Sequence, residues 1–174
     1  YDKPEALTRV LEELDIPFAC VATDIISGEE VVMNTGKVLE AVRASISIPV
    51  IFTVVKKDGR LLVDGGLVNN IPVSVARQMG ADYVIAVDVT PSRQERADHL
   101  LKHAESKEPG MLQVIAQSIY ITTSLTPCGI ATGADVIIHP KLAEINPADF
   151  HKARECILAG ELAATDIVAH IKRD

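Results

Sequence analysis

The stretch LLVDGGLVNNIPV, residues 61–73, carries the residues on which the prediction of the fold depends. Its apolar start predicts a strand, and Asp64 follows directly, ahead of the consecutive glycines Gly65 and Gly66. Because glycine has no side chain, another backbone or a ligand can approach closely there, and the carboxylate can lie in a cleft. Asp-Gly is also one of the commonest turn dipeptides, so the pair alone indicates an ordinary turn.

The residues after the glycines favour a strand-to-helix connection over a hairpin. Two amides, Asn69 and Asn70, precede Pro72, which stands where the first turn of a helix over 73–79 is predicted. A second, very apolar strand is then expected at 83–89. A hairpin would instead return directly into a second alternating strand.

The rest of the chain continues this alternation of strands and helices. In chain order we expect a helix over 7–14, strands at 18–23 and 30–33, a helix over 37–47, the strand at 61–63 with its helix and the strand at 83–89, a helix over 111–124, a strand at 135–139 and a terminal helix from 146–147 to 171. The polar segment 91–110 is expected to be a surface loop or helix. This order predicts an α/β fold with a mostly parallel central sheet flanked by helices, in one domain.

Composition and charge argue against several partners. The net charge of −7 argues against nucleic acid, because the short basic groups at 56–57 and 172–173 are too small to bind a phosphate backbone. The chain has no phosphate loop and no dinucleotide fingerprint, and no cofactor is expected.

The apolar runs and the cysteines bear on where in the cell the protein is expected. The longest apolar candidate, 44–55, is interrupted by Pro49 and is too short to cross a membrane, which predicts a soluble protein. Cys20, Cys128 and Cys156 are odd in number and lack metal-ligand spacing, so reduced thiols in the cytoplasm are expected.

Three aspartates stand at predicted strand ends, where open α/β sheets bind their ligands. Asp64 is the main candidate. Asp88 is expected to anchor nearby backbone by hydrogen bonds, whereas Asp24 is expected either to be such an anchor or to lie beside the site. A metal site built from Asp24, Asp64 and Asp88 is a weaker alternative.

Histidines and serines offer little further chemistry. His99 and His103 have the i, i+4 spacing of a metal pair, without the acidic residue between them that the zincin pattern requires. His139 is expected to be a satisfied residue at a strand terminus. No serine lies in the G-x-S-x-G setting of a nucleophile elbow.

Several segments, taken in order, resemble the patatin-like phospholipase family, specifically its bacterial members. The similarity runs from about residue 14 to residue 161. It is carried by VATD (21–24), SGEEVV (27–32), AVRASISIP (41–49), the stretch 61–73, GADYVIAVDV (80–89), GADVIIHP (133–140) and NPADFHKARECILAGE (146–161).

The resemblance implies a three-layer fold related to the α/β-hydrolases and a serine acyl hydrolase that uses a Ser-Asp dyad. Asp64 would be the general base, taking the proton of the serine directly. Gly65 and Gly66 would let the loop pass close behind the nucleophile. Together with Asn69, Asn70 and Asp24, they are the expected substrate-binding residues or neighbours of the reacting groups.

The resemblance is incomplete. The glycine-rich oxyanion loop and the G-x-S-x-G motif, N-terminal to the aspartate in the family, are missing, and the sequence opens at Tyr1. We therefore interpret residues 1–174 as the acid-bearing C-terminal part of a single patatin-like domain, inactive alone. After Pro49 the family usually has a glycine, and here Val50 follows.

The expected partners are a lipid or other acyl ester substrate and the N-terminal portion of the parent chain. Peripheral contact with a membrane is compatible with the resemblance. The rival hypothesis is a non-catalytic binding or interaction module on the same fold, in which Asp64 only stabilises its turn.

Overall fold

The computed structural model describes residues 9–91, 94–95, 110–125, 131–142, 145 and 149–171. The chain divides into two compact units. Unit 1 comprises Tyr1–Asp82 and Gly110–Gly133, and unit 2 comprises Tyr83–Pro109 and Ala134–Asp174. The single domain expected from the sequence stays a prediction.

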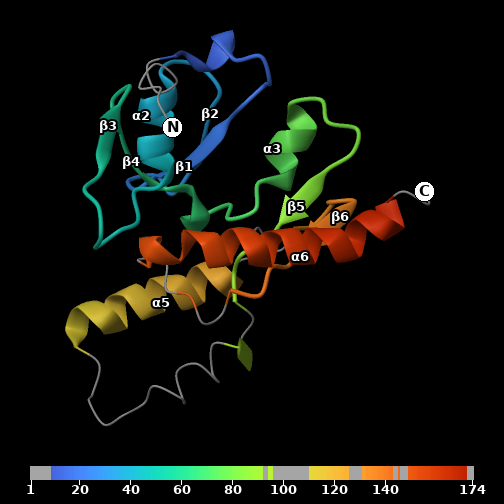
Figure 1. Cartoon of the computed structure of the whole chain (residues 1–174). Coiled ribbons are helices and arrows are strands. Elements are labelled where there is room, and N and C mark those ends of the chain that lie inside the picture. The colour runs from blue at the N-terminus through green and yellow to red at the C-terminus, as the bar shows by residue number, and fades with distance from the viewer. Residues whose placement is uncertain are drawn as a thin grey trace. The chain divides into compact units, whose positions relative to one another are not determined.

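Unit 1 contains a four-stranded sheet in the order β2-β1-β4-β3 (Figure 1). The strands are β1 (Cys20–Asp24), β2 (Glu30–Met33), β3 (Val55–Lys57) and β4 (Arg60–Asp64). Each of the three neighbouring pairs is antiparallel. The central pair joins β1 to β4 and places Ala22 opposite Asp64.

A two-residue turn joins β3 to β4 and explains why they pair. Lys57 faces Arg60 across the turn, and Asp58 and Gly59 between them have φ angles of 49° and 76°. Two consecutive positive φ angles are the geometry of a type I′ hairpin, for which Asp-Gly is a strong sequence signal. Strand β3 was not expected from the sequence, although this Asp-Gly pair could have revealed it.

Helix α2 (Val38–Ser45) packs against the sheet through β1 and β4, and Figure 1 shows it lying over them. The buried side chains between them are small or aliphatic, which lets the helix approach closely. The buried core consists of Leu11, Cys20, Ala22, Met33, Ala41, Ala44 and Leu62. A 3₁₀ turn, η1 (Leu11–Glu13), contributes the first of these residues.

Three further helical elements belong to unit 1. Directly after β4 the chain forms the 3₁₀ turn η2 (Gly65–Leu67) and then helix α3 (Val73–Gln78). Helix α5 (Met111–Leu125) contacts η2.

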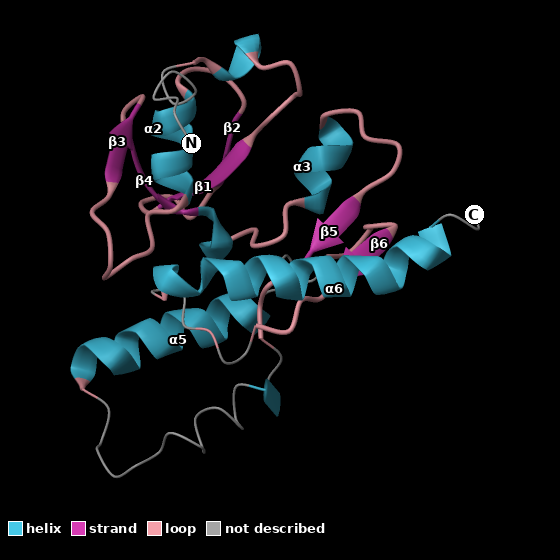
Figure 2. Ribbon diagram, in the orientation of Figure 1, coloured by secondary structure: helices cyan, strands magenta, loops and turns pink. Residues whose placement is uncertain are grey.

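Unit 2 contains a two-stranded parallel sheet of β5 (Ile85–Val87) and β6 (Val136–Ile138), drawn side by side in Figure 2. The 3₁₀ turn η4 (Phe150–Lys152) leads into helix α6 (Ala153–Ile171), which contacts β6. No helix among the described residues is long and apolar enough to span a lipid bilayer.

The α/β class predicted from the sequence is confirmed, but the sheet differs from the mostly parallel arrangement that was expected. Within the described residues, the larger sheet is antiparallel and parallel pairing is confined to β5 and β6. For the pairs β1–β2 and β3–β4 the reason is local, because short turns at 25–29 and 58–59 join these strands and a short turn cannot join parallel neighbours.

Most other predicted elements are found close to their expected positions. The first helix is a 3₁₀ turn in its described part, since residues 1–8 lie outside the described residues. Most of segment 91–110 and the start of the terminal helix at 146–147 also lie outside them.

Core packing in unit 1 can be tested at Leu62, whose side chain is 1% exposed beneath α2. We expect Leu62→Ala to reduce the free energy of unfolding by about 2–5 kcal/mol, measured by urea denaturation, because the change leaves a cavity. Ile16→Ala is the control, since Ile16 is 79% exposed and its truncation should change the free energy by less than about 0.5 kcal/mol. Equal effects of the two substitutions would contradict this description of the core.

Candidate active site

The main chain of Asp64 is fixed on both sides. Its N–H donates to the carbonyl oxygen of Ser47 at 3.0 Å, and its own carbonyl accepts from the hydroxyl of Thr23 at 2.8 Å. Ser47 is fully buried and Thr23 nearly so. The position of the acid is therefore set by β1 and by the segment that follows α2.

The carboxylate of Asp64 caps the 3₁₀ turn η2. Its Oδ1 accepts a hydrogen bond of 2.7 Å from the N–H of Gly66. Burial raises the pKa of the Asp64 carboxyl above its ordinary value, and the hydrogen bond from Gly66 lowers it by a smaller amount. A carboxylate with a raised pKa holds an abstracted proton better, which suits a general base.

The two glycines lie in close contacts, with backbone at Gly65 and with side-chain oxygens at Gly66. A Cβ atom at Gly65 would lie 2.3 Å from the carbonyl oxygen of Val21, a backbone atom that cannot move aside. A Cβ atom at Gly66 would lie 2.9 Å from Oδ1 of Asp64 and 2.9 Å from Oδ1 of Asn70. Glycine at 65 thus lets η2 lie against β1, and glycine at 66 leaves room for two polar oxygens.

The two amides differ in their surroundings. Asn69 is buried, and its Nδ2 donates to Oε1 of Glu30 at 2.8 Å and to the hydroxyl of Ser74 at 3.3 Å. It therefore links η2 to β2 and α3. Asn70 is exposed, with its side-chain oxygen beside Gly66 and thus near the carboxylate of Asp64. Their expected part in substrate binding stays a prediction.

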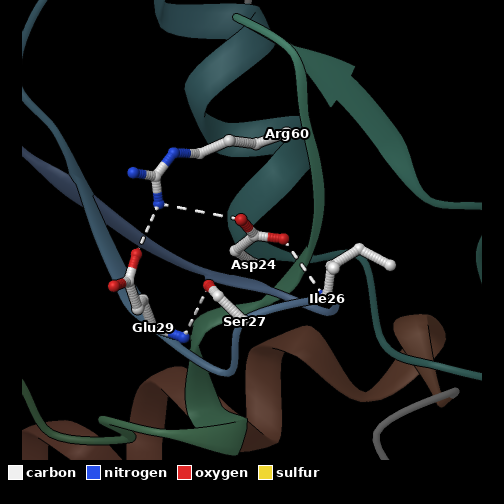
Figure 3. A network of polar contacts seen from close by, with 5 residues as sticks. All are labelled: Asp24, Ile26, Ser27, Glu29 and Arg60. Carbon is white, nitrogen blue, oxygen red and sulfur yellow. Dashed lines mark hydrogen bonds and ion pairs between the residues drawn. The ribbon is translucent and has the colours of Figure 1, made fainter.

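Asp24 anchors the turn between β1 and β2, as Figure 3 shows. Its Oδ1 accepts from the N–H of Ile26 at 3.1 Å, and its Oδ2 lies 3.7 Å from Nη1 of Arg60. The same Arg60 nitrogen lies 3.1 Å from Glu29, whose N–H donates to the hydroxyl of Ser27. These contacts support the anchoring role, and a role of Asp24 beside the reacting groups stays a prediction.

Asp88 and His139 form a pair in unit 2, at the carboxyl ends of β5 and β6. The two side chains approach to 3.5 Å, and Asp88 Oδ1 also accepts from the N–H of Thr90 at 2.9 Å. Both residues thus have partners of the kind expected from the sequence. Within the part of the chain that the structure describes, no group of three His, Cys, Asp or Glu side chains could hold a metal ion. His99 and His103 lie outside that part.

Sequence reasoning missed the part played by Ser47 and Arg43. The Arg43 guanidinium, on α2, donates to the hydroxyl of Ser47, and that hydroxyl donates back to the Arg43 carbonyl at 2.6 Å. Arg43 also lies 5.2 Å from the centroid of the Phe52 ring and 3.4 Å from the Thr53 carbonyl oxygen. The signal was a serine and an arginine one helical turn apart just before Pro49.

Val50 has a backbone conformation that favours glycine, with φ of 73°. This is the position at which the resemblance to the patatin-like family implies a glycine. A β-branched residue is strained in this conformation by about 1–2 kcal/mol. The loop after Pro49 therefore keeps the backbone turn that glycine favours, with a valine side chain in its place.

Comparison with known proteins shows which proteins this sequence is similar to. Residues 8–77, which include Asp64 and both glycines, match the sequence profile described as patatin-like phospholipase. The chain belongs to the patatin-like phospholipase family. An NTE family protein of Mycobacterium tuberculosis is 30% identical over 172 residues, covering 89% of this chain and 29% of that protein. Patatin-like phospholipase domain-containing protein 7 of Mus musculus is 43% identical over 83 residues, covering 47% of this chain and 6% of that protein.

A second NTE family protein of Mycobacterium tuberculosis is 40% identical over 82 residues, which cover 47% of this chain and 23% of that protein. The chain thus spans less than a third of the length of each of these relatives.

The half-buried carboxyl of Asp64 makes stability depend on pH in a stated direction. Because its pKa is raised on folding, its contribution to stability is complete below the ordinary pKa of 3.8 and is lost as the pH rises through the folded-state value. Asn at position 64 keeps an oxygen for the Gly66 N–H but carries no charge. We expect Asp64→Asn to gain stability relative to the wild type as the pH rises from about 3 to 7, measured by urea denaturation.

Asp58→Asn is the matched control for this experiment. It removes one negative charge from an exposed turn in which Asn-Gly is as suitable as Asp-Gly. If Asp64→Asn changes the free energy of unfolding by the same amount at pH 3 and pH 7, the partial burial of the Asp64 carboxyl is contradicted. The same holds if Asp58→Asn shows the same dependence on pH.

The strain at Val50 gives a second prediction. We expect Val50→Gly to raise the free energy of unfolding by about 0.5–1 kcal/mol, because the relief of the positive φ exceeds the added entropy of the unfolded chain. Val54→Gly, at an equally exposed valine without a positive φ, should lower it by about 0.5–1 kcal/mol. Thermal unfolding of both variants measures the difference, and losses of the same size would show that Val50 is unstrained.

Proposed function

We propose that Asp64 is the general base of a Ser-Asp dyad in a lipid acyl hydrolase, and that this chain supplies the acid but not the serine. The observation that carries the proposal is a half-buried carboxylate with a raised pKa at the end of β4. It is followed by Gly65, which packs η2 against β1, and by Gly66, which leaves room beside the carboxylate oxygen. Membership of the patatin-like phospholipase family supports a lipid or related ester as the substrate class.

In the proposed reaction, the carboxylate of Asp64 takes the proton of the serine hydroxyl as the serine oxygen attacks the ester carbonyl carbon. The proton then passes to the oxygen of the leaving alcohol as the C–O bond breaks, leaving an acyl-serine. Water then attacks the acyl carbonyl carbon as its proton passes to the same carboxylate. The bond between the acyl carbon and the serine oxygen breaks, the proton returns to the serine oxygen, and the fatty acid leaves. The dyad needs no histidine relay and no cofactor.

The 174 residues contain no G-x-S-x-G motif and no glycine-rich oxyanion loop. We infer that the chain alone does not hydrolyse esters, because each oxyanion donor is worth about 3–4 kcal/mol of transition-state stabilisation and the covalent step has no nucleophile. The N-terminal portion of a longer parent chain is the proposed source of both. A cytoplasmic location is part of the proposal, supported by the free thiols of Cys20 and Cys156.

A structural role for Asp64 is the competing hypothesis, and a specific contact favours it. The carboxylate caps η2 through Gly66, so it could serve only to stabilise this turn in a non-catalytic interaction module. Asparagine is an equally good capping residue but cannot accept the serine proton. Asp64→Asn therefore separates the two roles.

The test uses the product of the whole reading frame, which must encode a G-x-S-x-G motif for the proposal to hold. With p-nitrophenyl esters as substrate, we expect Asp64→Asn to lower kcat by about 10²–10⁴-fold while the thermal stability is retained. Asp58→Asn, which removes a charge elsewhere, should leave kcat unchanged. A full-length Asp64→Asn variant with wild-type kcat would refute the dyad.

A separate assay tests the inactivity of the 174-residue chain. We expect no ester turnover and no labelling by a fluorophosphonate, since neither can proceed without an activated serine. Turnover by this chain that Asp64→Ala abolishes would overturn the claim.

A further inference from the structure

Residues 46–54, between α2 and β3, form a short surface segment that we call the apolar loop. Six of its nine side chains are large, apolar and between 38% and 65% exposed, namely Ile46, Ile48, Val50, Ile51, Phe52 and Val54. Single exposed apolar side chains are ordinary, but a contiguous group of them marks a contact surface.

The apolar loop is held in place by polar contacts with α2 and with the end of β4. The guanidinium of Arg43 bonds the hydroxyl of Ser47 and reaches the carbonyl and hydroxyl oxygens of Thr53, with its plane near the Phe52 ring. The carbonyl of Ser47 accepts from the N–H of Asp64. The loop is thus attached directly to the strand end that carries the acid.

The strained residue of the loop is among those exposed to water. Val50 adopts a φ of 73°, which glycine would adopt without strain, and its side chain is half exposed. The side chain does not complete a buried core that would compensate for the strain. Strained backbone that persists in a folded protein is often found where the chain binds a ligand or reacts.

The charge around the loop is opposite to that of the whole chain. Residues 41–57 contain Arg43, Lys56 and Lys57 and no Asp or Glu, whereas the chain carries a net charge of −7. Lys57 lies 3.8 Å from Glu40 and 3.9 Å from Asp58, which offset part of its charge. The contacts of Arg43 given above are to neutral groups, and Lys56 is exposed on the edge strand β3.

We propose that the apolar loop docks on an anionic phospholipid bilayer, with its apolar side chains among the acyl chains and the flanking cations at the phosphate groups. An apolar segment bordered by Lys and Arg is the combination that binds such interfaces. The remaining negative charge of the chain is repelled by the same surface, so that this face is the one that approaches it.

A second copy of the chain matches the loop less well. Pairing through the loop would bring two cationic segments together in two chains that each carry −7. A bilayer supplies both an apolar interior and negative phosphates. The docking goes beyond the proposed hydrolysis and does not require it, because binding to lipid needs no serine.

The test is co-sedimentation of the purified 174-residue protein with vesicles. We expect binding to vesicles of equal parts phosphatidylglycerol and phosphatidylcholine, and weaker binding to vesicles of phosphatidylcholine alone. NaCl at 0.5 M, which gives a screening length of about 4 Å, should weaken binding to the anionic vesicles. Ile51→Glu should lower the partition coefficient by about tenfold or more. Lys56→Glu should lower binding to the anionic vesicles only.

Ile16→Glu is the matched control, since it places the same charge at an isoleucine of unit 1 that is also highly exposed and lies outside the loop. Circular dichroism and thermal unfolding check that all three Glu variants remain folded. The proposal is overturned if the wild type does not bind anionic vesicles, or if Ile51→Glu and Ile16→Glu bind equally. It is also overturned if sedimentation velocity shows a dimer that Ile51→Glu dissociates. None of these readouts involves ester turnover, so the docking and the dyad can fail separately.

Discussion

The main chain of Gly65 passes so close to the carbonyl of Val21 that no side chain fits between them. This contact lets η2 begin immediately after β4, and the position of η2 determines where the carboxylate of Asp64 lies. The hydrogen bond from the Asp64 N–H to the Ser47 carbonyl fixes the same residue from the other side. The geometry of the acid is thus the product of backbone contacts among β1, β4 and the segment after α2.

The carboxylate of Asp64 has two properties that act against each other. It stabilises η2 as a cap, yet its burial makes the ionised form costly in the folded protein. A residue selected for stability alone would have no reason to keep a charge there, because asparagine caps as well. The charge is thus a cost in the folded state, and the cap explains how the side chain is oriented.

Local patterns in the sequence were sufficient for part of the fold. The bounds of β2 were predicted correctly, and α2, α3 and α5 lie close to their expected ranges, because apolar periodicity and Pro or Gly punctuation define them. The direction of strand pairing was not predicted correctly. The alternation of strands and helices suggested parallel neighbours, whereas the turn at Asp58-Gly59 joins β3 and β4 as a hairpin. Asp64 was chosen as the candidate base from its strand and glycines, and that role stays a prediction. The contacts from Arg43 through Ser47 to Asp64 depend on pairing across the fold, which no local pattern contains.

The contacts of Arg60 with Asp24 and Glu29 bear on the order in which the sheet folds. Each hairpin of the sheet closes over a few residues, which takes microseconds, whereas Glu29 and Arg60 are 31 residues apart and Thr23 and Asp64 are 41 apart. The central β1-β4 pairing therefore carries the entropy of closing the long intervening loop. We expect the two hairpins to form first and their joining to limit the rate, so that the acid reaches its final place only in the last step of assembly.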